Sequence, residues 1–346
     1  MHHKNFARSR QGYDPLRQRK GDLFYFPVLS PSLHKVAQNK IVSQRFNKEN
    51  TMNSSQVTDF KDKIILVTGA TNGIGKQTAE AMAQTGATLV IVGRNPEKTN
   101  QLTQALQSMP GAGKIHSLIA DLSSQAEIRK LADDFKNKFS RLDILINNAG
   151  ALFTTHETTV DGFERTWALN HLNYFLLTSL LKDVLLASAP ARIINVSSDA
   201  HKPARILWDD LQYTRATFAS GWPAYCQSKL ANIMFTKELS RKLAGTGVIT
   251  NCLHPGFVNT GFAKNNGRLA KAAMLISRPF QRDALKGAET VIWAATNIDA
   301  GKLSGEYLYD CKVRKPTRLA RNAADAKRLW YLSEEMTTTQ GVWSSI

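Results

Sequence analysis

The sequence predicts an α/β protein: a doubly wound parallel sheet with helices on both faces, formed as a single domain. Short apolar runs rich in β-branched residues alternate with longer amphipathic stretches along most of the chain. A parallel sheet that is covered on both sides requires this alternation. Polar or glycine-rich motifs also follow the ends of several apolar runs, at the edge where ligands bind in such sheets.

These patterns assign the elements in chain order. The first apolar run, residues 64–67, leads into a glycine-rich segment and then into helix-forming residues that stop before Gly86. The expected strands are residues 64–67, 88–92, 114–119, 144–146, 192–196, 248–252 and 305–308. The expected helices are residues 76–85, 97–107, 125–139, 163–186, 224–243 and 285–296, with a further amphipathic lid helix at 261–281.

Three glycines, Gly69, Gly73 and Gly75, lie between the first strand and the first helix. Glycine lets the backbone approach a pyrophosphate, and the start of a helix favours its charge because free N–H groups and the helix dipole point there. The spacing therefore predicts a dinucleotide site. A glycine-rich β-turn that binds nothing is the alternative.

Tyr225 and Lys229 stand four residues apart on a predicted helix, downstream of Ser197 and Ser198 at the end of a predicted strand. Residues i and i+4 share a helix face, so the Lys229 ammonium can lie beside the Tyr225 phenol and lower its pKa. This would bring a phenol into the range that general acid–base catalysis needs. The same spacing also occurs on helices where the two residues are only a surface pair.

Further motifs follow in order, and with them the chain resembles the short-chain dehydrogenase/reductase family. They are Asp121-Leu122, the segments 147–150 and 169–172, Ser198, and the segment 254–260. The resemblance covers residues 60–337 and implies a Rossmann-type fold. Within the family it is closest to the retinol dehydrogenase-like branch, which also holds the WW-domain oxidoreductases and, more distantly, the protochlorophyllide reductases. The segments 192–201, 228–233 and 307–312 carry that similarity.

The resemblance implies a role for each catalytic residue. Tyr225 is expected to exchange the proton, Lys229 to bind the nicotinamide ribose and tune Tyr225, and Ser198 to orient the carbonyl. Asn170 is expected to hold a water that resupplies the proton, and Ser197 is the alternative to Ser198. The cofactor-binding residues implied are Gly69, Thr71, Asn72, Gly73, Ile74, Gly75, Arg94, Asp121, Leu122, Asn148, Ala149, Gly150, Tyr225, Lys229, Pro255, Gly256, Val258 and Thr260.

The residue after the second strand bears on the choice of cofactor. NAD-binding chains usually place an acid there to hold the ribose hydroxyls, whereas this chain has Arg94 and no acid. A guanidinium suits a 2′-phosphate, which favours NADP(H) over NAD(H). An ordinary surface arginine at a strand end is the alternative.

The expected reaction interconverts a carbonyl and an alcohol on a small lipophilic substrate, such as a retinal-like or steroid-like compound or an aldehyde. Residues 199–223 and 261–281 would form the pocket walls, although their apolar side chains could simply pack on the core. Two other functions stay open: a specialised reductase in pigment or lipid metabolism, and a regulator that senses a dinucleotide without catalysis.

Composition limits the other classes. The net charge of +17 could suit nucleic acid, but no nucleic-acid-binding motif accompanies it. Three unpaired cysteines indicate a reducing compartment, and no His/Cys spacing predicts a metal. No apolar run is long enough to span a membrane, so we expect a cytoplasmic protein. A basic amphipathic segment at 261–281 leaves peripheral membrane contact open, and relatives are often oligomers.

The first residues differ from the rest. Residues 1–50 hold ten Lys or Arg against three acids, without periodicity, so residues 1–58 are expected to be a disordered basic extension. A targeting arm, an organelle transit segment and translated sequence ahead of a start at Met52 all fit; we favour the last. Residues 59–337 would form the catalytic domain and residues 338–346 a tail.

Overall fold

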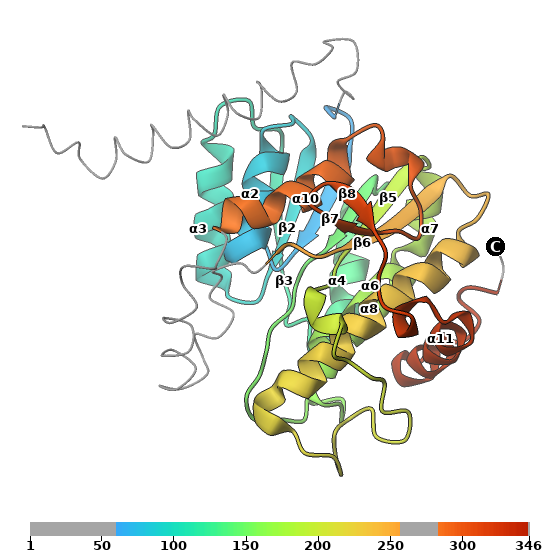
Figure 1. Ribbon diagram of the computed structural model, residues 1–346. Coiled ribbons are helices and arrows are strands. Elements are labelled where there is room, and N and C mark those ends of the chain that lie inside the picture. Colours follow the sequence, from blue (N-terminus) through green and yellow to red (C-terminus); the bar gives the residue numbers. More distant parts are fainter. Residues whose placement is uncertain (1–59, 257–282, 345–346) are drawn as a thin grey trace, which may run out of the picture. The chain divides into compact units, whose positions relative to one another are not determined.

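The computed structural model describes residues 60–256 and 283–344, all within the unit that spans Thr58–Ile346. Its strands form one sheet in the order β3-β2-β1-β4-β5-β6-β7-β8, parallel except for the last pair (Figure 1). The strands are β1 Ile64–Thr68, β2 Thr88–Gly93, β3 Ile115–Ile119, β4 Ile144–Asn147, β5 Ala191–Val196, β6 Val248–Leu253, β7 Tyr307–Tyr309 and β8 Lys312–Arg314. The order reverses between β1 and β4, which opens a crevice at their carboxyl ends.

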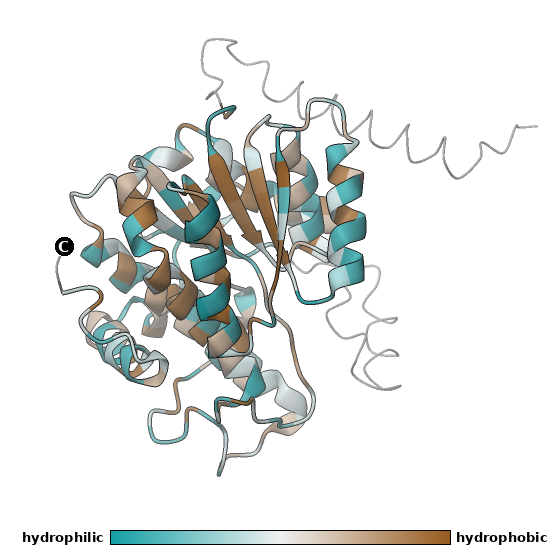
Figure 2. Ribbon diagram, turned by 180° about the vertical axis from the view of Figure 1, so that it is seen from behind, coloured by the Kyte–Doolittle hydropathy of each residue, from teal (hydrophilic) through white to brown (hydrophobic). Residues whose placement is uncertain are grey.

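Helices cover both faces of the sheet, as the sequence predicted. The main ones are α2 Gly73–Ala83, α3 Pro96–Gln107, α4 Gln125–Lys138, α6 Asn173–Leu180, α7 Lys182–Ala187, α8 Trp222–Lys242, α10 Ala284–Thr296 and α11 Ala323–Thr337. Side chains alternate along β1: Leu66 packs with α4 and α6, whereas Ile65 and Val67 pack with α2, α3 and α10. The strands are accordingly hydrophobic on both faces, and the helices turn hydrophilic surfaces outward (Figure 2).

Polar side chains determine where these helices begin. Asn72, Asn95, Ser124, Asp283 and Asn322 each accept a hydrogen bond from a backbone N–H in the first turn of the helix that follows. Each satisfies a donor that the helix itself leaves free. The helices expected at 76–85, 97–107, 125–139, 224–243 and 285–296 agree with the structure to within a few residues at each end.

The stretch expected to be helical at 163–186 is helical over most of its length but is divided into several elements. The structure has a short α5 (Arg165–Trp167), a π-helical turn η1 (Ala168–Leu172), and then α6 and α7 as separate helices. The wider turn contains Asn170, whose side chain forms two hydrogen bonds with the backbone of Ala151. A hydrophobic pattern cannot distinguish this turn from α-helix, because only one residue is added to the repeat.

The C-terminal part holds elements that the sequence did not indicate. Asp310 and Cys311, with φ of 48° and 55°, form the two-residue turn of the β7–β8 hairpin, which lacks the usual Asn-Gly or Asp-Gly signal. The helix α11 packs on α8. The segment expected to be a tail returns to the core: Trp343 is 4% exposed and donates a hydrogen bond to Ser179 Oγ.

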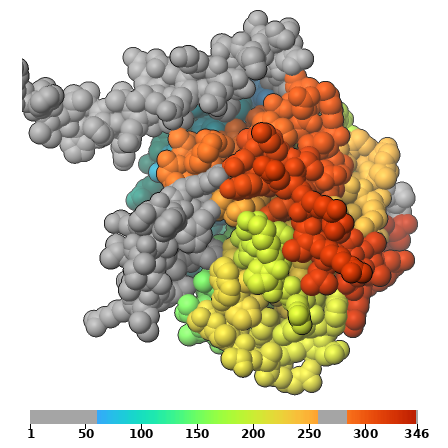
Figure 3. Space-filling view, viewed as in Figure 1, coloured from blue at the N-terminus to red at the C-terminus, as the bar shows by residue number. Residues whose placement is uncertain are grey.

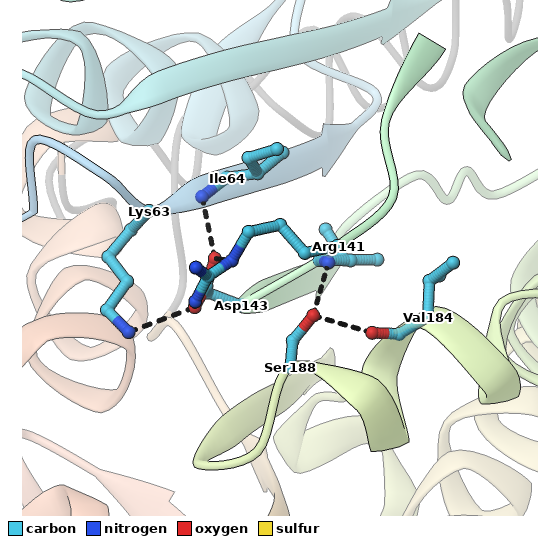
Figure 4. A network of polar contacts seen from close by, with 7 residues as sticks. Lys63, Ile64, Arg141, Asp143, Val184 and Ser188 are labelled. Carbon is cyan, nitrogen blue, oxygen red and sulfur yellow. Dashed lines mark hydrogen bonds and ion pairs between the residues drawn. The ribbon is translucent and has the colours of Figure 1, made fainter. Parts of the chain in front are cut away.

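A buried carboxylate joins β1 and β4 at the edge opposite the crevice (Figure 4). Asp143 is 2% exposed and accepts hydrogen bonds from the Ile64 amide, the Lys63 ammonium and the Arg141 guanidinium. Nearby, Ser188 accepts from the Leu142 amide and donates to the Val184 carbonyl. These contacts fix the starts of the two strands that border the crevice.

Several expectations lie outside the described residues. They are the basic extension at 1–58 with Met52, the lid helix at 261–281, and the cofactor residues Val258 and Thr260. Among the helices that the structure describes, none has the length and apolarity needed to cross a bilayer.

Candidate active site

The turn between β1 and α2 has no room for a side chain at Gly69 or Gly75. A Cβ on Gly75 would lie 2.2 Å from the Gly69 carbonyl oxygen, and one on Gly69 would lie 2.8 Å from Ala149 Cα. Gly69 and Gly73 also adopt φ of 65° and 53°, which glycine tolerates best. Unlike α3 and α4, which carry an acid in the first turn, α2 begins without one. Its positive end is therefore available to an external anion.

Side chains after β4 brace this turn. Asn148 Nδ2 donates to the carbonyl oxygens of Thr68, at 2.9 Å, and Gly69, at 3.2 Å. In return, Thr68 Oγ1 accepts from the backbone N–H groups of Asn148 and Ala149. We expected residues 148–150 to line a cofactor; the structure gives the Asn148 amide a bracing role between two strand ends.

Arg94 and Asp121 meet at the ends of β2 and β3. Arg94 Nη1 lies 3.6 Å from Asp121 Oδ2, with side chains 57% and 31% exposed. Burial raises the pKa of Asp121, but hydrogen bonds from Ser123 and the charge of Arg94 outweigh it and lower the pKa overall. Leu122, also expected near the cofactor, is buried in the core. The guanidinium thus stands exposed beside one carboxylate.

The helix α8 presents Tyr225 and Lys229 to the carboxyl end of β5. It begins after Gly221, whose Cβ would lie 1.7 Å from the Phe153 carbonyl oxygen, so only glycine fits there. Tyr225 is 7% exposed and shares a hydrogen bond with the Ser198 hydroxyl. Lys229 Nζ lies 5.6 Å from the centre of the Tyr225 ring and donates to the Val196 carbonyl oxygen at 3.0 Å. The structure thereby brings together three of the predicted catalytic residues.

The pKa of Tyr225 does not follow the expectation from spacing. Burial raises it above the ordinary value for a phenol, and the hydrogen bond from Ser198 offsets this only in part. Burial also lowers the pKa of Lys229 to about 7, so this lysine carries only a partial charge near neutrality. Lys229 therefore does not lower the phenol pKa in the protein by itself, because burial disfavours both charged forms.

Asn170 lies on the π-helical turn, fully buried behind Tyr225 and Lys229. Its side chain exchanges two hydrogen bonds of 2.9 Å with the backbone of Ala151 and donates one of 3.0 Å to Ser228 Oγ. A Cβ on Gly150 would lie 3.1 Å from Asn170 Oδ1 and 3.3 Å from Lys229 Nζ. Asn170, Gly150 and Lys229 are therefore close neighbours. The water expected at Asn170 stays a prediction.

The two candidate serines differ in their contacts. Ser197 is 1% exposed and donates to the Lys229 carbonyl oxygen at 2.7 Å, which fixes the helix that carries the lysine. Ser198 is more exposed and faces Tyr225. The geometry therefore favours Ser198 for contact with a substrate oxygen.

The loop after β6 contacts the turn that follows Ser198. His254 Nδ1 accepts from the Asp199 amide at 3.1 Å, and the next two residues are Pro255 and Gly256, the last that are described before residue 283. His201 and His171 are held by hydrogen bonds to Ser198 and Ser333. Within the described ranges, no group of His, Cys, Asp and Glu is placed to hold a metal.

The sequence did not predict three features of the site. The Val196 carbonyl, which holds Lys229, is backbone and leaves no mark in the residue pattern. Asn232, one helical turn after Lys229, donates to the same carbonyl at 3.4 Å. Trp222, 48% exposed, stacks on Tyr225 with ring centres 5.8 Å apart; its spacing of three residues on a helix could have indicated it.

Comparisons with known proteins agree with this arrangement. A family model for short chain dehydrogenases matches residues 63–210 and 212–270. Retinol dehydrogenase 12 from Homo sapiens is 40% identical over 274 residues, which cover 79% of this chain and 86% of that protein. Retinol dehydrogenase 13 from Homo sapiens is 39% identical over 273 residues, covering 78% and 82%.

Solved structures give the same result. The crystal structure of an uncharacterized protein from Mycobacterium paratuberculosis has a TM-score of 0.66 at 32% identity and covers 82% of this chain and 97% of its own. The Pseudomonas aeruginosa RhlG/NADP active-site complex has a TM-score of 0.57 at 28% identity, covering 72% and 96%. The fold, the order of the motifs and these matches lead to one conclusion: the chain belongs to the short chain dehydrogenase family.

Proposed function

We propose that the protein is an NADP(H)-dependent oxidoreductase that interconverts a carbonyl and an alcohol on a small lipophilic substrate. Membership of the family supports oxidoreduction of this kind. The observation that carries the proposal is the convergence of Ser198, Tyr225 and Lys229 at the carboxyl end of β5, with Asn170 behind them.

The chain fits a dinucleotide along the same edge of the sheet. The glycine turn leaves no space for a Cβ at Gly69 or Gly75, and α2 begins without an acid in its first turn. Residues after β1 would hold the pyrophosphate, and Arg94 after β2 would hold a 2′-phosphate. Lys229, Pro255 and Gly256 would border the nicotinamide end. The bound cofactor would supply or accept the hydride.

The side chains then divide the remaining chemistry. Ser198 would donate a hydrogen bond to the carbonyl oxygen, and Tyr225 would give that oxygen a proton as negative charge develops. Since burial raises the pKa of Tyr225, the phenol stays protonated and can act as the acid in reduction. Lys229, in its protonated form, would support the ionised phenol that follows, and its pKa of about 7 leaves part of the lysine protonated near neutrality. The proton that Tyr225 gives up would be resupplied through the water expected at Asn170.

A lipophilic substrate is supported by the surroundings of Tyr225. Trp222 leaves 48% of its surface exposed while it stacks on the phenol ring. Leu152, partly buried, packs in the same hydrophobic cluster as Tyr225. Apolar surface next to the reacting oxygen favours a substrate with a hydrophobic body.

Turnover with each cofactor tests the proposal. NADPH and NADH oxidation should be followed with retinal, steroid ketones, medium-chain aldehydes and quinones. We expect turnover with NADPH at a higher kcat/KM than with NADH, and a preference for the more lipophilic carbonyls. NADPH binding without turnover on any of them would favour a dinucleotide-sensing regulator instead.

A further inference from the structure

A cleft of about 430 Å³ lies at the far end of the sheet, between the β7–β8 hairpin and the 3₁₀ turn η2 (Asp199–His201). In Figure 3, the orange-red segment that holds the hairpin borders the yellow-green segment that follows β5. The hydroxyl of Tyr307 donates to Asp199 Oδ1 at 2.9 Å, and the His201 ring meets the Tyr307 ring edge-on at 5.0 Å. The two walls are therefore joined by direct contacts between residues that line the cleft.

The lining is positively charged. Lys202, Arg314 and Lys315 contribute cations, and Asp199 contributes the carboxylate. Lys202 Nζ lies 2.7 Å from Asp199 Oδ2, which neutralises that acid. Within residues 60–256 and 283–344, neither Arg314 nor Lys315 forms an ion pair. The cleft thus keeps two cations that the rest of the described chain does not balance.

The hairpin aims one of these cations at the cleft. In the antiparallel register, Tyr307 pairs with Arg314 and Tyr309 with Lys312, so these side chains share one face of the ribbon. That face is turned to η2, because Tyr307 contacts both Asp199 and His201. Cations on an edge strand also discourage pairing with another chain. That role requires only exposed charge and does not require a cleft that tyrosines help to line.

The cleft is separate from the predicted cofactor phosphates. The pyrophosphate turn follows β1, and β4, β5 and β6 lie between β1 and β7 in the sheet. Neighbouring strands are about 4.8 Å apart, so four spacings separate the two places by roughly 19 Å. One phosphate group cannot serve both.

We propose that this cleft is a second anion site, which binds a phosphate group, free or carried by a larger molecule, through Arg314 and Lys315. A guanidinium offers the paired donors that phosphate oxygens accept, and an ammonium adds a mobile charge. The cleft wall begins at Asp199, directly after Ser198, and the Asp199 amide also bonds to His254. A ligand there contacts the turn that positions Ser198. The binding step does not rest on the proposed function.

Calorimetric titration of the full chain with inorganic phosphate tests the site, at constant ionic strength, first without NADPH and then with NADPH saturating. The test variant is Arg314→Glu/Lys315→Glu, which reverses two exposed charges in the lining. The matched control, Lys114→Glu/Lys138→Glu, makes the same change in net charge at exposed positions beside β3, at the opposite edge of the sheet. We expect phosphate to bind the wild type and the control alike, and to bind the test variant at least about tenfold more weakly.

Three results would overturn the site: no phosphate binding to the wild type, equal weakening in both variants, or displacement of phosphate by NADPH. Vesicles then separate the two sources of the phosphate group. The ligand is a lipid headgroup if the wild type binds phosphatidic acid vesicles but not phosphatidylcholine vesicles, and if the test variant no longer binds phosphatidic acid vesicles. If phosphate binds and neither vesicle does, the ligand is a soluble phosphate compound.

Discussion

Lys229 and Val196 are joined by a hydrogen bond of 3.0 Å, from the buried ammonium to the carbonyl oxygen at the end of β5. The same oxygen also accepts hydrogen bonds from the Tyr174 hydroxyl and the Asn232 side-chain amide, each at 3.4 Å. Among the described residues, no carboxylate pairs with Lys229, so its charge is supported by the peptide dipole at Val196 and by the rings of Tyr174 and Tyr225, whose centres lie 5.8 Å and 5.6 Å from Nζ. The lysine is thereby held in place and yet remains easy to deprotonate.

This environment predicts a stability that rises with pH. An unfolded lysine titrates near about 10.4, whereas burial lowers the pKa of Lys229 to about 7 in the fold. Between these values the unfolded chain binds the extra proton, so the free energy of unfolding should increase as pH rises from about 7 to 10. Lys229→Met should remove this increase in urea titrations. An identical pH dependence in both proteins would contradict the burial argument.

His171 predicts a dependence of the same sign at acidic pH. It is fully buried next to Asn170, between Ser333 and Trp167, and burial lowers its pKa to about 4. The unfolded histidine, with a pKa near about 6.5, gains its proton first as the pH falls, so stability is lost between about pH 6.5 and 4. The loss should reach roughly 3 kcal/mol and should be absent in His171→Gln.

The exposed His116 provides the control for this prediction. Burial also lowers its pKa, but it lies on the surface of β3, where water screens its charge. His116→Gln should therefore retain the acid transition of the wild type. The argument fails if both substitutions shift the transition equally.

The pair formed by Arg94 and Asp121 predicts how the protein selects its cofactor. Arg94→Glu should weaken NADPH binding about tenfold or more and leave NADH nearly unchanged, because only NADPH carries the 2′-phosphate. Asp121→Asn should act in the opposite direction, since it frees the guanidinium and removes a nearby negative charge. Dissociation constants from nucleotide fluorescence would measure both. If Arg94→Glu weakened the binding of NADPH and NADH equally, Arg94 would not be the residue that selects the cofactor.

Asp143 predicts a loss of stability without a loss of function. Asp143→Ala leaves the Ile64 amide and two cations without their shared acceptor, which should cost about 3 kcal/mol. Asp134→Ala, which removes an exposed pair with Lys130, should cost less than about 1 kcal/mol. Because Asp143 lies at the edge opposite the crevice, the KM for NADPH should stay unchanged. A raised KM in folded Asp143→Ala would show that the strand starts also control the site.

Sequence alone predicted the parts of the site that depend on residue type. Glycine is required where a Cβ would lie 2.2 Å from a carbonyl, and Tyr225 and Lys229 share a helix face whatever surrounds them. The π-helical turn at Asn170 and the carbonyl of Val196 were not predicted, because backbone geometry leaves no residue pattern. The pKa of Tyr225 was predicted in the wrong direction, because burial, which spacing cannot report, dominates it.

The β7–β8 hairpin shows a further limit. Its turn, Asp310–Cys311, adopts positive φ at two residues that only occasionally do so, and tertiary contacts maintain it. The register that results places Arg314 beside Tyr307 and forms one wall of the cleft. No local motif predicts that juxtaposition.

Comparison of the wild type with Tyr225→Phe tests the central claim most directly. The substitution removes only the hydroxyl, so the stacked contact with Trp222 and the fold should be retained. We predict that NADPH binds with unchanged affinity while carbonyl reduction falls by about 10³-fold, the usual contribution of a positioned proton donor. If Tyr225→Phe reduced the same carbonyls at the wild-type rate, proton transfer would not pass through Tyr225, and the proposed mechanism would be wrong.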